Sequence, residues 1–332
     1  MQPSQLNSGL HIVSTGMYVP ERILTNDDLS KWVDTTDEWI FSRTGIRERR
    51  IAAPGELASD MGAKASIKAL ENSGIAASEI DLILVATVTG DAAFPSTACY
   101  IQHKIGATRA AAMDLQAACS GFIYGLVVAE QFLRSGVYKN ILLVGTERLS
   151  SIVDWTDRAT CVLFGDGAGA VLLSSRAGHG GMLSFDLGAN GDHHAMLKLN
   201  HIHREIRFGE PPVPMQQPCI HMTGKEVFKQ AVNAMAKSAN KVMEEARLKV
   251  TDLRLVITHQ ANSRIIEALA EKLSVPSEKC FTNVHRYGNI SAACIPVAMH
   301  EASQQIEFKR GDKILLVAFG GGLTWASCVI EW

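Results

Sequence analysis

The chain has 332 residues, of which 47% are hydrophobic and 20% are charged, and its formal net charge is −2. The length suits about two globular domains, and the near-neutral charge gives no electrostatic basis for binding nucleic acid or an anionic membrane. The apolar runs are short and broken by glycine or charge, so none predicts a membrane-spanning helix.

The first ten residues and the cysteines bear on the cellular compartment in which the protein is expected. Residues 1–10 are polar and lack the basic-then-apolar pattern of a secretory signal peptide. Seven cysteines occur at irregular spacings without a CxxC pair, namely Cys99, Cys119, Cys161, Cys219, Cys280, Cys294 and Cys328. An odd number without an export signal favours reduced thiols, so we expect a cytoplasmic protein. We interpret all of them except Cys119 as structural.

Short runs rich in Val, Ile and Leu alternate with alanine-rich helical patterns. In chain order they predict a helix over 58–73, strands over 79–86 and 110–115, a helix over 122–133 and a strand over 139–144. A second series predicts a helix over 227–246, a strand over 250–257, a helix over 264–273 and a strand over 312–317. TGKE at 223–226 has capping-box spacing. The alternation indicates α/β architecture, with surface loops expected over 177–217.

The two series also indicate an internal duplication. Segment 79–86 is similar to 250–257, and 139–144 is similar to 312–317. The separations agree, at 60 residues from Asp81 to Ile141 and 62 from Asp252 to Ile314. Chance would explain one such pair of apolar strands. Two pairs in the same order favour two halves of like topology, over residues 1–176 and 177–332.

Cys119 lies on the predicted turn between the strand over 110–115 and the helix over 122–133. A thiol at the positive end of a helix dipole would have a lowered pKa and be more reactive. Alone, it could equally be a small buried hydrophobe. However, His259 in THQAN (258–262) and Asn289 in YGNISAA (287–293) lie on comparable turns in the other half. Together these residue types predict nucleophilic catalysis assembled from distant segments.

Two glycine clusters occur, at 164–170 (FGDGAGA) and 319–325 (FGGGLTW). Neither carries the Gly-Lys-Ser/Thr ending of a phosphate loop, and neither matches GxGxxG before a helix. We therefore expect close backbone approach, with free N–H groups over 320–322 available to hold an oxyanion.

A histidine-rich stretch could suggest a metal site. It contains His193, His194, His201 and His203. No cysteine or carboxylate pattern with metal-ligand spacing accompanies it, so loop histidines and no metal are expected.

Longer motifs resemble the β-ketoacyl-acyl carrier protein synthase III family, the initiating condensing enzymes of bacterial type II fatty acid synthesis. The resemblance covers residues 12–332, and its motifs are WVDTTDEWI (32–40), RTGIRER (43–49), ACSGF (118–122), DR (157–158) with the first glycine cluster, HQAN (259–262), NISAA (289–293) and GGGLTW (320–325). It implies the thiolase fold, a duplicated α/β unit in five layers (αβαβα), normally as a homodimer.

The resemblance implies an acyltransferase mechanism without a cofactor. Cys119 would take the acyl group from an acyl-CoA substrate, and malonyl-acyl carrier protein would then bind and lose carbon dioxide. His259 and Asn289 would donate hydrogen bonds to the enolate oxygen, and the carbanion would attack the acyl-Cys119 carbonyl. Backbone N–H groups of Cys119 and Gly321 would form the oxyanion hole.

Further roles follow only from the resemblance. The coenzyme A and pantetheine contacts would be Trp39, Arg43, Thr44, Arg158, Gly224 and Asn262. Phe94 would cross the dimer to floor the partner's acyl pocket. Lys229 and Arg264 would face the acidic carrier protein, although ordinary solvated charges explain them nearly as well.

Departures from the family pattern are few. Ile290 and Cys294 stand where Thr and a small polar residue are common, and neither is expected to touch the reacting groups. Residues 177–217 fit the family least, which leaves acyl-chain preference open.

The sequence disfavours several other functions. A thiolase would carry a second cysteine in the 320–322 loop, and an elongating synthase would carry a histidine at position 289. A Cys-His-Asn hydrolase lacks a reason for the duplicated framework, and a binding module would not need Cys119, His259 and Asn289 together. A related synthase of secondary metabolism, using an unusual acyl- or aroyl-CoA, stays open.

Overall fold

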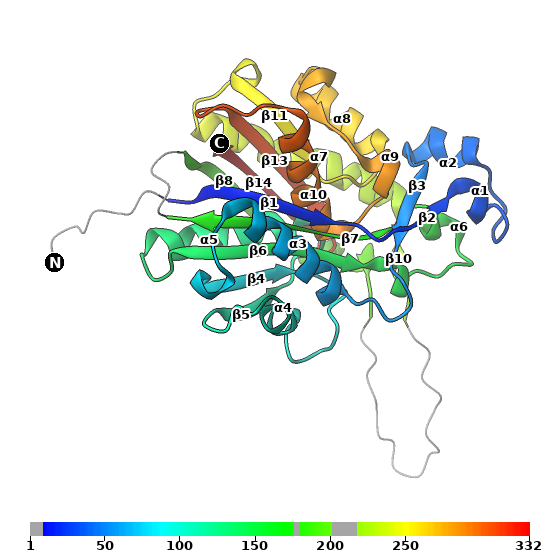
Figure 1. The fold of residues 1–332 in the computed structure, drawn as a ribbon. Coiled ribbons are helices and arrows are strands. Elements are labelled where there is room, and N and C mark those ends of the chain that lie inside the picture. The colour runs from blue at the N-terminus through cyan, green and yellow to red at the C-terminus, as the bar shows by residue number, and fades with distance from the viewer. Residues whose placement is uncertain (1–8, 176–179, 201–217) are drawn as a thin grey trace, which may run out of the picture.

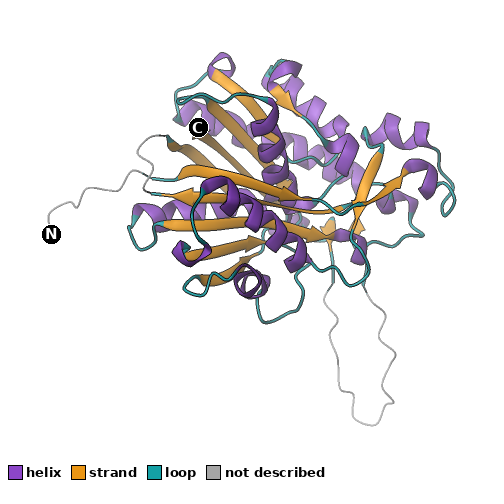
Figure 2. Ribbon diagram, in the orientation of Figure 1, coloured by secondary structure: helices purple, strands orange, loops and turns teal. Residues whose placement is uncertain are grey.

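The computed structural model describes residues 9–175, 180–200 and 218–332, and two five-stranded sheets form its centre (Figures 1 and 2). The first has the order β1-β7-β6-β4-β5 and the second β12-β11-β13-β14-β8. The first contains β1 (His11–Tyr18), β4 (Leu82–Ala86), β5 (Ala111–Leu115), β6 (Asn140–Arg148) and β7 (Asp166–Ser174). The second contains β8 (Gly181–Ala189), β11 (Leu253–Thr258), β12 (Cys280–Phe281), β13 (Lys313–Gly320) and β14 (Thr324–Glu331).

Helices cover both sheets and fill the space between them, giving five layers. On the outer face of the first sheet lie α3 (Ala58–Ser73) and α4 (Thr97–Ile105), and on that of the second lie α7 (Gly224–Glu245) and α8 (Ser263–Leu273). Between the sheets lie α5 (Gly121–Arg134) and α10 (Cys294–Gln305). Apolar side chains from both sheets and both central helices join in one core. Within the described ranges, no helix is long and apolar enough to cross a membrane.

A smaller group of elements lies beside the sheets, at the right in Figure 1. It contains β2 (Arg22–Thr25), β3 (Glu48–Ile51), α1 (Asn26–Leu29), α2 (Asp37–Thr44), α6 (Arg158–Cys161) and α9 (Val284–Tyr287). The short strands β9 (Leu197–Lys198) and β10 (His221–Met222) pair separately. The buried Arg49 holds this group against the first sheet's loops, donating hydrogen bonds to the Leu24 and Val162 carbonyl oxygens at 3.1 and 2.7 Å.

The two sheets share one topology, as the repeated segments predict. β4 and β6 pair in parallel with Leu82 opposite Ile141, and β11 and β13 pair in parallel with Leu255 opposite Ile314. In each sheet the antiparallel partners then follow on one side of that pair. The expected boundary between residues 176 and 177 lies outside the described residues.

Two local expectations were wrong. The stretch over 177–217 was expected to be loop, yet β8 pairs antiparallel with β14 along residues 181–189. Its glycines read as turn signals, but they are tolerated because β8 is an edge strand of the sheet. The capping box at the start of α7 does not form, since the Thr223 hydroxyl donates to the Met196 carbonyl oxygen at 3.3 Å instead.

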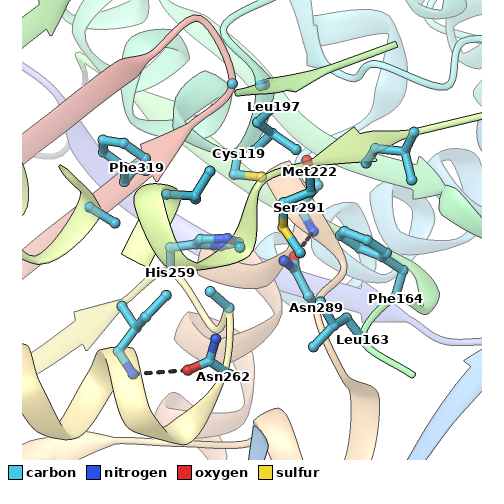
Figure 3. Close-up of a pocket in the computed structure, with 18 of the residues that line it drawn as sticks. Cys119, Leu163, Phe164, Leu197, Met222, His259, Asn262, Asn289, Ser291 and Phe319 are labelled. Carbon is cyan, nitrogen blue, oxygen red and sulfur yellow. Dashed lines mark hydrogen bonds between the residues drawn. The ribbon is translucent and has the colours of Figure 1, made fainter. Parts of the chain in front are cut away.

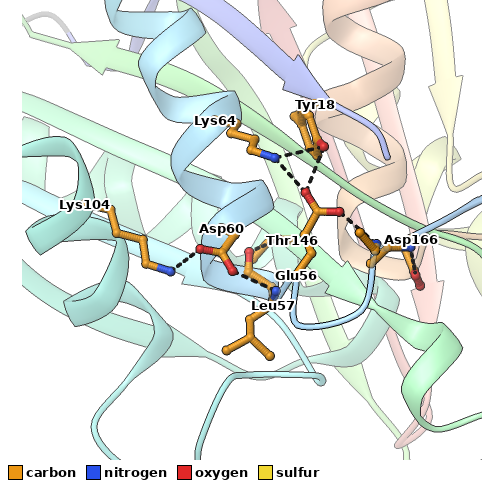
Figure 4. Close-up of polar contacts among 11 residues, drawn as sticks. Tyr18, Glu56, Leu57, Asp60, Lys64, Lys104, Thr146 and Asp166 are labelled. Atoms are coloured by element: carbon orange, nitrogen blue, oxygen red, sulfur yellow. Dashed lines mark hydrogen bonds and ion pairs between the residues drawn. The ribbon is translucent and has the colours of Figure 1, made fainter. Parts of the chain in front are cut away.

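Figure 4 shows how polar contacts fasten α3 to the first sheet. The Thr146 hydroxyl in β6 donates to the Ala58 carbonyl oxygen at 2.7 Å, at the start of the helix. Nearly two turns later, Lys64 bridges Glu56 and the Tyr18 hydroxyl of β1 at 2.7 and 3.0 Å. These contacts fix α3 to β1 and β6 of the first sheet.

Candidate active site

A pocket of about 940 Å³ opens where the loops of the two halves meet. Its lining includes Cys119 from the first half and His259 and Asn289 from the second (Figure 3). Cys119 and His259 each follow the end of a strand and precede a helix, whereas Asn289 follows the short helix α9 and precedes α10. The three side chains lie near one another in the pocket, so three segments distant in sequence form a single site.

Cys119 lies in a short 3₁₀ turn, η2 (Ala118–Ser120), that leads directly into α5. Ala118 adopts the left-handed conformation (φ 47°), which turns the chain sharply between β5 and the helix. The thiol is buried, and burial raises its pKa to about 12, with the nearby Glu147 carboxylate acting in the same direction. The predicted lowering of this pKa was wrong, because loss of solvent outweighs the position at the helix end.

The second glycine cluster approaches the backbone of this turn closely, as expected. A Cβ atom on Gly320 would lie 2.7 Å from the Cys119 backbone nitrogen. Thr324, at the start of β14, donates its hydroxyl to the Ala117 carbonyl oxygen at 3.0 Å. Gly321 lines the pocket beside these contacts. The β13–β14 connection therefore fixes where the thiol sits.

His259 follows β11 and is buried, and its backbone N–H donates to the Val317 carbonyl oxygen of β13 at 2.7 Å. Burial lowers the pKa of its imidazole to about 4. Within the described part of the chain, its Nδ1 has no hydrogen-bond partner. The ring is therefore neutral near pH 7.

Asn289 is held by its backbone and by one side-chain oxygen. Its N–H donates to the Leu163 carbonyl oxygen at 2.8 Å, and its carbonyl oxygen accepts from the Gly165 N–H at 3.1 Å. The side-chain Oδ1 accepts from the Ser291 N–H at 2.9 Å. Among the residues that the structure describes, none accepts a hydrogen bond from Nδ2. The amide therefore presents a free donor where it lines the pocket.

Cys294 lies closer to the site than expected. Its thiol lies 3.9 Å from the Asn289 Oδ1 and accepts from the Ile290 N–H at 3.3 Å. The expectation that it touches no reacting group was therefore wrong, because the first turn of α10 lies directly under the Asn289 loop. All seven cysteines are free thiols, and Cys99 and Cys219 are exposed, so these two do not contribute to the core.

The pocket lining also includes an aromatic ring, that of Trp39, with two cations beside it. The guanidinium groups of Arg43 and Arg158 each lie 4.8 Å from the centre of the Trp39 ring. Thr36 caps the amino end of α2 by accepting from the Trp39 N–H at 3.1 Å. Thr44 is buried at the end of the same helix. This group forms a flat apolar surface edged by positive charge.

Of the remaining predicted contact residues, some line the pocket and others lie outside its lining. Gly224, Asn262 and Arg264 line the pocket together with Trp39, Arg43 and Thr44. Lys229 is exposed on α7 outside the lining, and Arg158 reaches the site only through Trp39. Phe94 is 86% exposed and does not line this chain's own pocket.

The described histidines of the histidine-rich stretch do not form a metal-binding cluster. His194 is exposed and reaches the pocket lining, and His193 is half-buried. His201 and His203 lie outside the described residues. Across 9–175, 180–200 and 218–332, no group of three or more histidine, cysteine or acidic side chains could hold a metal ion.

A buried thiol at a helix start, beside a neutral imidazole and an amide donor, is suited to forming and resolving a thioester. In a duplicated five-layered α/β framework, this site defines an acyl-transferring enzyme of the thiolase fold.

Comparison with known proteins specifies the family. A family model described as 3-Oxoacyl-[acyl-carrier-protein (ACP)] synthase III matches residues 113–191, and one described as its C-terminal part matches residues 243–332. Beta-ketoacyl-[acyl-carrier-protein] synthase III of Roseiflexus sp. (strain RS-1) is 50% identical, covering 96% of each chain. That of Clostridium acetobutylicum is also 50% identical, over 98% of this chain and 99% of the relative.

A solved structure of high similarity supports the same family. The crystal structure of 3-oxoacyl-[acyl-carrier-protein] synthase III from Aquifex aeolicus VF5 has a TM-score of 0.91 and 46% identity, covering 98% of this chain and 100% of that one. The chain belongs to the β-ketoacyl-acyl carrier protein synthase III family.

Proposed function

We propose that this protein condenses a short acyl-CoA primer with malonyl-acyl carrier protein, releasing carbon dioxide, through an acyl group held on Cys119. The product is a 3-oxoacyl-acyl carrier protein, the first intermediate of a fatty acid. The observation that carries this proposal is the convergence of Cys119, His259 and Asn289 in one pocket, in a chain 50% identical to synthases of this name.

The first step is transfer of the acyl group. The Cys119 sulfur attacks the thioester carbonyl, and coenzyme A leaves as the thiolate. The oxyanion of the tetrahedral intermediate accepts hydrogen bonds from the Cys119 and Gly321 N–H groups. Gly321 lines the pocket beside Cys119, in agreement with this role. Loss of one such donor would raise the barrier by roughly 3 to 4 kcal/mol.

The second step uses the other half of the molecule. When the malonyl group loses carbon dioxide, negative charge develops on the thioester oxygen. The imidazole of His259 and the Nδ2 group of Asn289 donate hydrogen bonds to that oxygen. Because burial keeps His259 neutral, its ring N–H donates without forming a buried ion pair with the malonyl carboxylate. The carbanion then attacks the acyl-Cys119 carbonyl.

The pocket's shape favours substrates carried on a long flexible arm. Adenine would stack against Trp39, and Arg43 and Arg158 would contact its phosphates. Gly224 and Asn262 line the path between this surface and Cys119, where a pantetheine arm would lie. Arg264 at the rim and Lys229 on α7 would meet an acidic carrier protein. The chemistry of both steps needs no cofactor.

We further propose a homodimer in the cytoplasm. Phe94 is a large apolar side chain exposed at the tip of a loop, an arrangement that burial against a second subunit would explain. A related synthase acting on an unusual acyl- or aroyl-CoA is the second candidate. The relatives at about half identity are named as synthase III, which favours the first.

The test separates the two steps. His259→Ala and Asn289→Ala should still take an acyl group from acetyl-CoA, yet form 3-oxoacyl-carrier protein at least roughly 10²-fold more slowly than the native protein. Acylation is followed by intact mass, and condensation by carbon dioxide release. Loss of acylation in both variants, from protein with native stability, would contradict the assignment of these side chains to decarboxylation.

A further inference from the structure

A buried carboxylate lies behind the nucleophile and has no role in the two steps above. Glu147, near the end of β6, is fully buried. It accepts hydrogen bonds from the Thr87 hydroxyl at 3.2 Å, the Val88 N–H at 3.1 Å and the Thr89 hydroxyl at 2.5 Å. None of the lysine or arginine residues in the described ranges forms an ion pair with it. Such a carboxylate is costly to keep charged.

Ser291 neighbours both this carboxylate and the Cys119 thiol, because its turn packs against the strand that carries Glu147 and against the turn that carries Cys119. Its hydroxyl is buried and has no partner at normal hydrogen-bonding distance among the described residues. It is nevertheless close enough to both groups to lower the pKa of each. Ser291 begins η7 (Ser291–Ala293) in the left-handed conformation (φ 47°), as Ala118 does in η2. The two turns are therefore equivalent positions of the duplicated fold, placed against each other.

Tight packing fixes this arrangement. A Cβ atom on Gly145, two residues before Glu147, would lie 2.4 Å from the Ala292 carbonyl oxygen. A Cβ atom on Gly121 would lie 3.2 Å from the Ala86 Cβ. The strand that carries Glu147 and the turn that carries Ser291 are therefore packed backbone against backbone, with no room for a side chain at position 145.

The reaction needs a proton acceptor at this place. Burial raises the pKa of Cys119 to about 12, so the thiol is protonated before acylation. His259, with a pKa lowered by burial to about 4, is a weak base. Burial raises the pKa of Glu147 to about 7, against the opposing effect of its hydrogen bonds. A carboxylate with that pKa can accept and return a proton near neutral pH.

Glu147 is a better proton acceptor for Cys119 than the other titratable groups nearby. Cys294 on α10 is a thiol whose pKa burial raises further than that of Cys119. Arg148 and Asp166 lie next to Glu147 and Gly167 on β6 and β7, and alternation along a strand directs them to the opposite face of the sheet.

We propose that Ser291 and Glu147 form a proton relay for Cys119, an inference that rests on the proposed function. As the Cys119 sulfur bonds to the acyl carbon, its proton passes to the Ser291 oxygen, and the Ser291 proton passes to the Glu147 carboxylate. The coenzyme A thiolate leaves and takes its proton from water.

Glu147 then holds the proton while the acyl-enzyme exists. When the carbanion attacks and the tetrahedral intermediate collapses, Cys119 leaves as a thiolate. It takes the proton back through Ser291, and Glu147 becomes a carboxylate again. Over one cycle the relay is unchanged, and the single proton consumed is the one that water supplies to coenzyme A.

The test measures the acylation step alone. Native protein, Glu147→Gln, Glu147→Asp and Ser291→Ala are mixed with acetyl-CoA, and the rate of acetyl adduct formation is followed by intact mass between about pH 5.5 and pH 9. Asp166→Asn and Ser238→Ala are the matched controls. Asp166 is also a buried carboxylate, Ser238 is also a buried hydroxyl without a partner among the described residues, and neither lines the pocket.

We expect the native acylation rate to rise with pH through about 7 and then level. Glu147→Gln and Ser291→Ala should be slower by roughly 10²-fold at pH 7 and should lose this titration. Glu147→Asp should keep it at a reduced rate, and the controls should keep both rate and profile. Equal slowing at every pH would show a structural role and overturn the relay, as would native rates in Glu147→Gln. If Glu147→Gln does not fold, Ser291→Ala and Glu147→Asp decide by the same criterion.

The two proposals fail differently. No adduct on the native protein from any of a panel of acyl-CoAs would overturn the proposed function. A native adduct with unaltered pH profiles in all variants would overturn the relay alone.

Discussion

At the scale of single residues, burial sets the protonation state of the catalytic groups. It raises the pKa of Cys119 to about 12 and lowers that of His259 to about 4. Both groups are therefore neutral in the resting site near pH 7. A neutral pair can coexist in an apolar pocket where a thiolate and an imidazolium would each lose solvation.

The shifted pKa of His259 predicts a pH dependence of stability. Its pKa in the folded protein lies below the ordinary value, so the unfolded chain binds more protons between about pH 4 and pH 6.5. Stability is complete above that window and is lost as pH falls through it. The contribution at pH 7 is on the order of 3 kcal/mol.

Denaturant unfolding of native protein and His259→Gln at pH 4.5 and pH 7 measures this contribution. The free energy of unfolding should fall with acid by about 2 kcal/mol less in the variant than in the native protein. His221→Gln, at an exposed histidine, serves as the control and should behave like the native protein. The same acid loss in His259→Gln would show that other groups cause it.

At the scale of elements, the β13–β14 connection fixes η2, the turn that carries Cys119. Gly320→Ala places a methyl group 2.7 Å from the Cys119 nitrogen and 3.1 Å from the Ser120 nitrogen, so one backbone segment must move. We expect acylation to slow by roughly 10²-fold, because a displacement of about 1 Å is enough to misplace a nucleophile.

The measurement is the rate of adduct formation at saturating acetyl-CoA. Gly191→Ala is the control, since a Cβ atom there would meet nothing within 4 Å, and it should react at the native rate. A native rate in Gly320→Ala would mean that this contact does not position Cys119.

The elements themselves were largely predictable from local sequence. The helix expected over 58–73 is α3 at those bounds, because its alanine-rich pattern stops at Gly74, which takes the left-handed C-cap conformation. The strand β8 was missed because glycines at an edge strand resemble those of a loop. The raised pKa of Cys119 and the position of Glu147 were also missed. Both depend on burial that arises only when the two halves pack together.

At the scale of the whole molecule, each of the duplicated halves contributes different residues to the pocket. In the proposed mechanism one half supplies the nucleophile Cys119 and the other supplies the enolate donors His259 and Asn289, and all three line the pocket at the junction of the halves. His259 and Asn289 were predicted as candidates from the sequence. The backbone hydrogen bonds that hold His259 and Asn289 in place join segments far apart in the sequence, so they could not be predicted from local sequence.

The proposed dimer gives a prediction at this scale. If Phe94 floors the partner's acyl pocket, Phe94→Ala should enlarge that pocket and shift acylation towards longer primers, while the protein remains a dimer. Sedimentation equilibrium gives the assembly state, and competition between acetyl-CoA and hexanoyl-CoA gives the preference. A monomeric native protein, or an unaltered preference in a dimeric variant, would contradict this role.

The central claim is a covalent acyl group on Cys119 that malonyl-acyl carrier protein removes. Intact mass of native protein and Cys119→Ala after incubation with a panel of acyl-CoAs, before and after adding malonyl-acyl carrier protein, tests it most directly. We predict one acyl adduct on the native protein, none on the variant, and loss of the adduct as 3-oxoacyl-carrier protein forms. An adduct on Cys119→Ala, or product formed by it at the native rate, would contradict the mechanism.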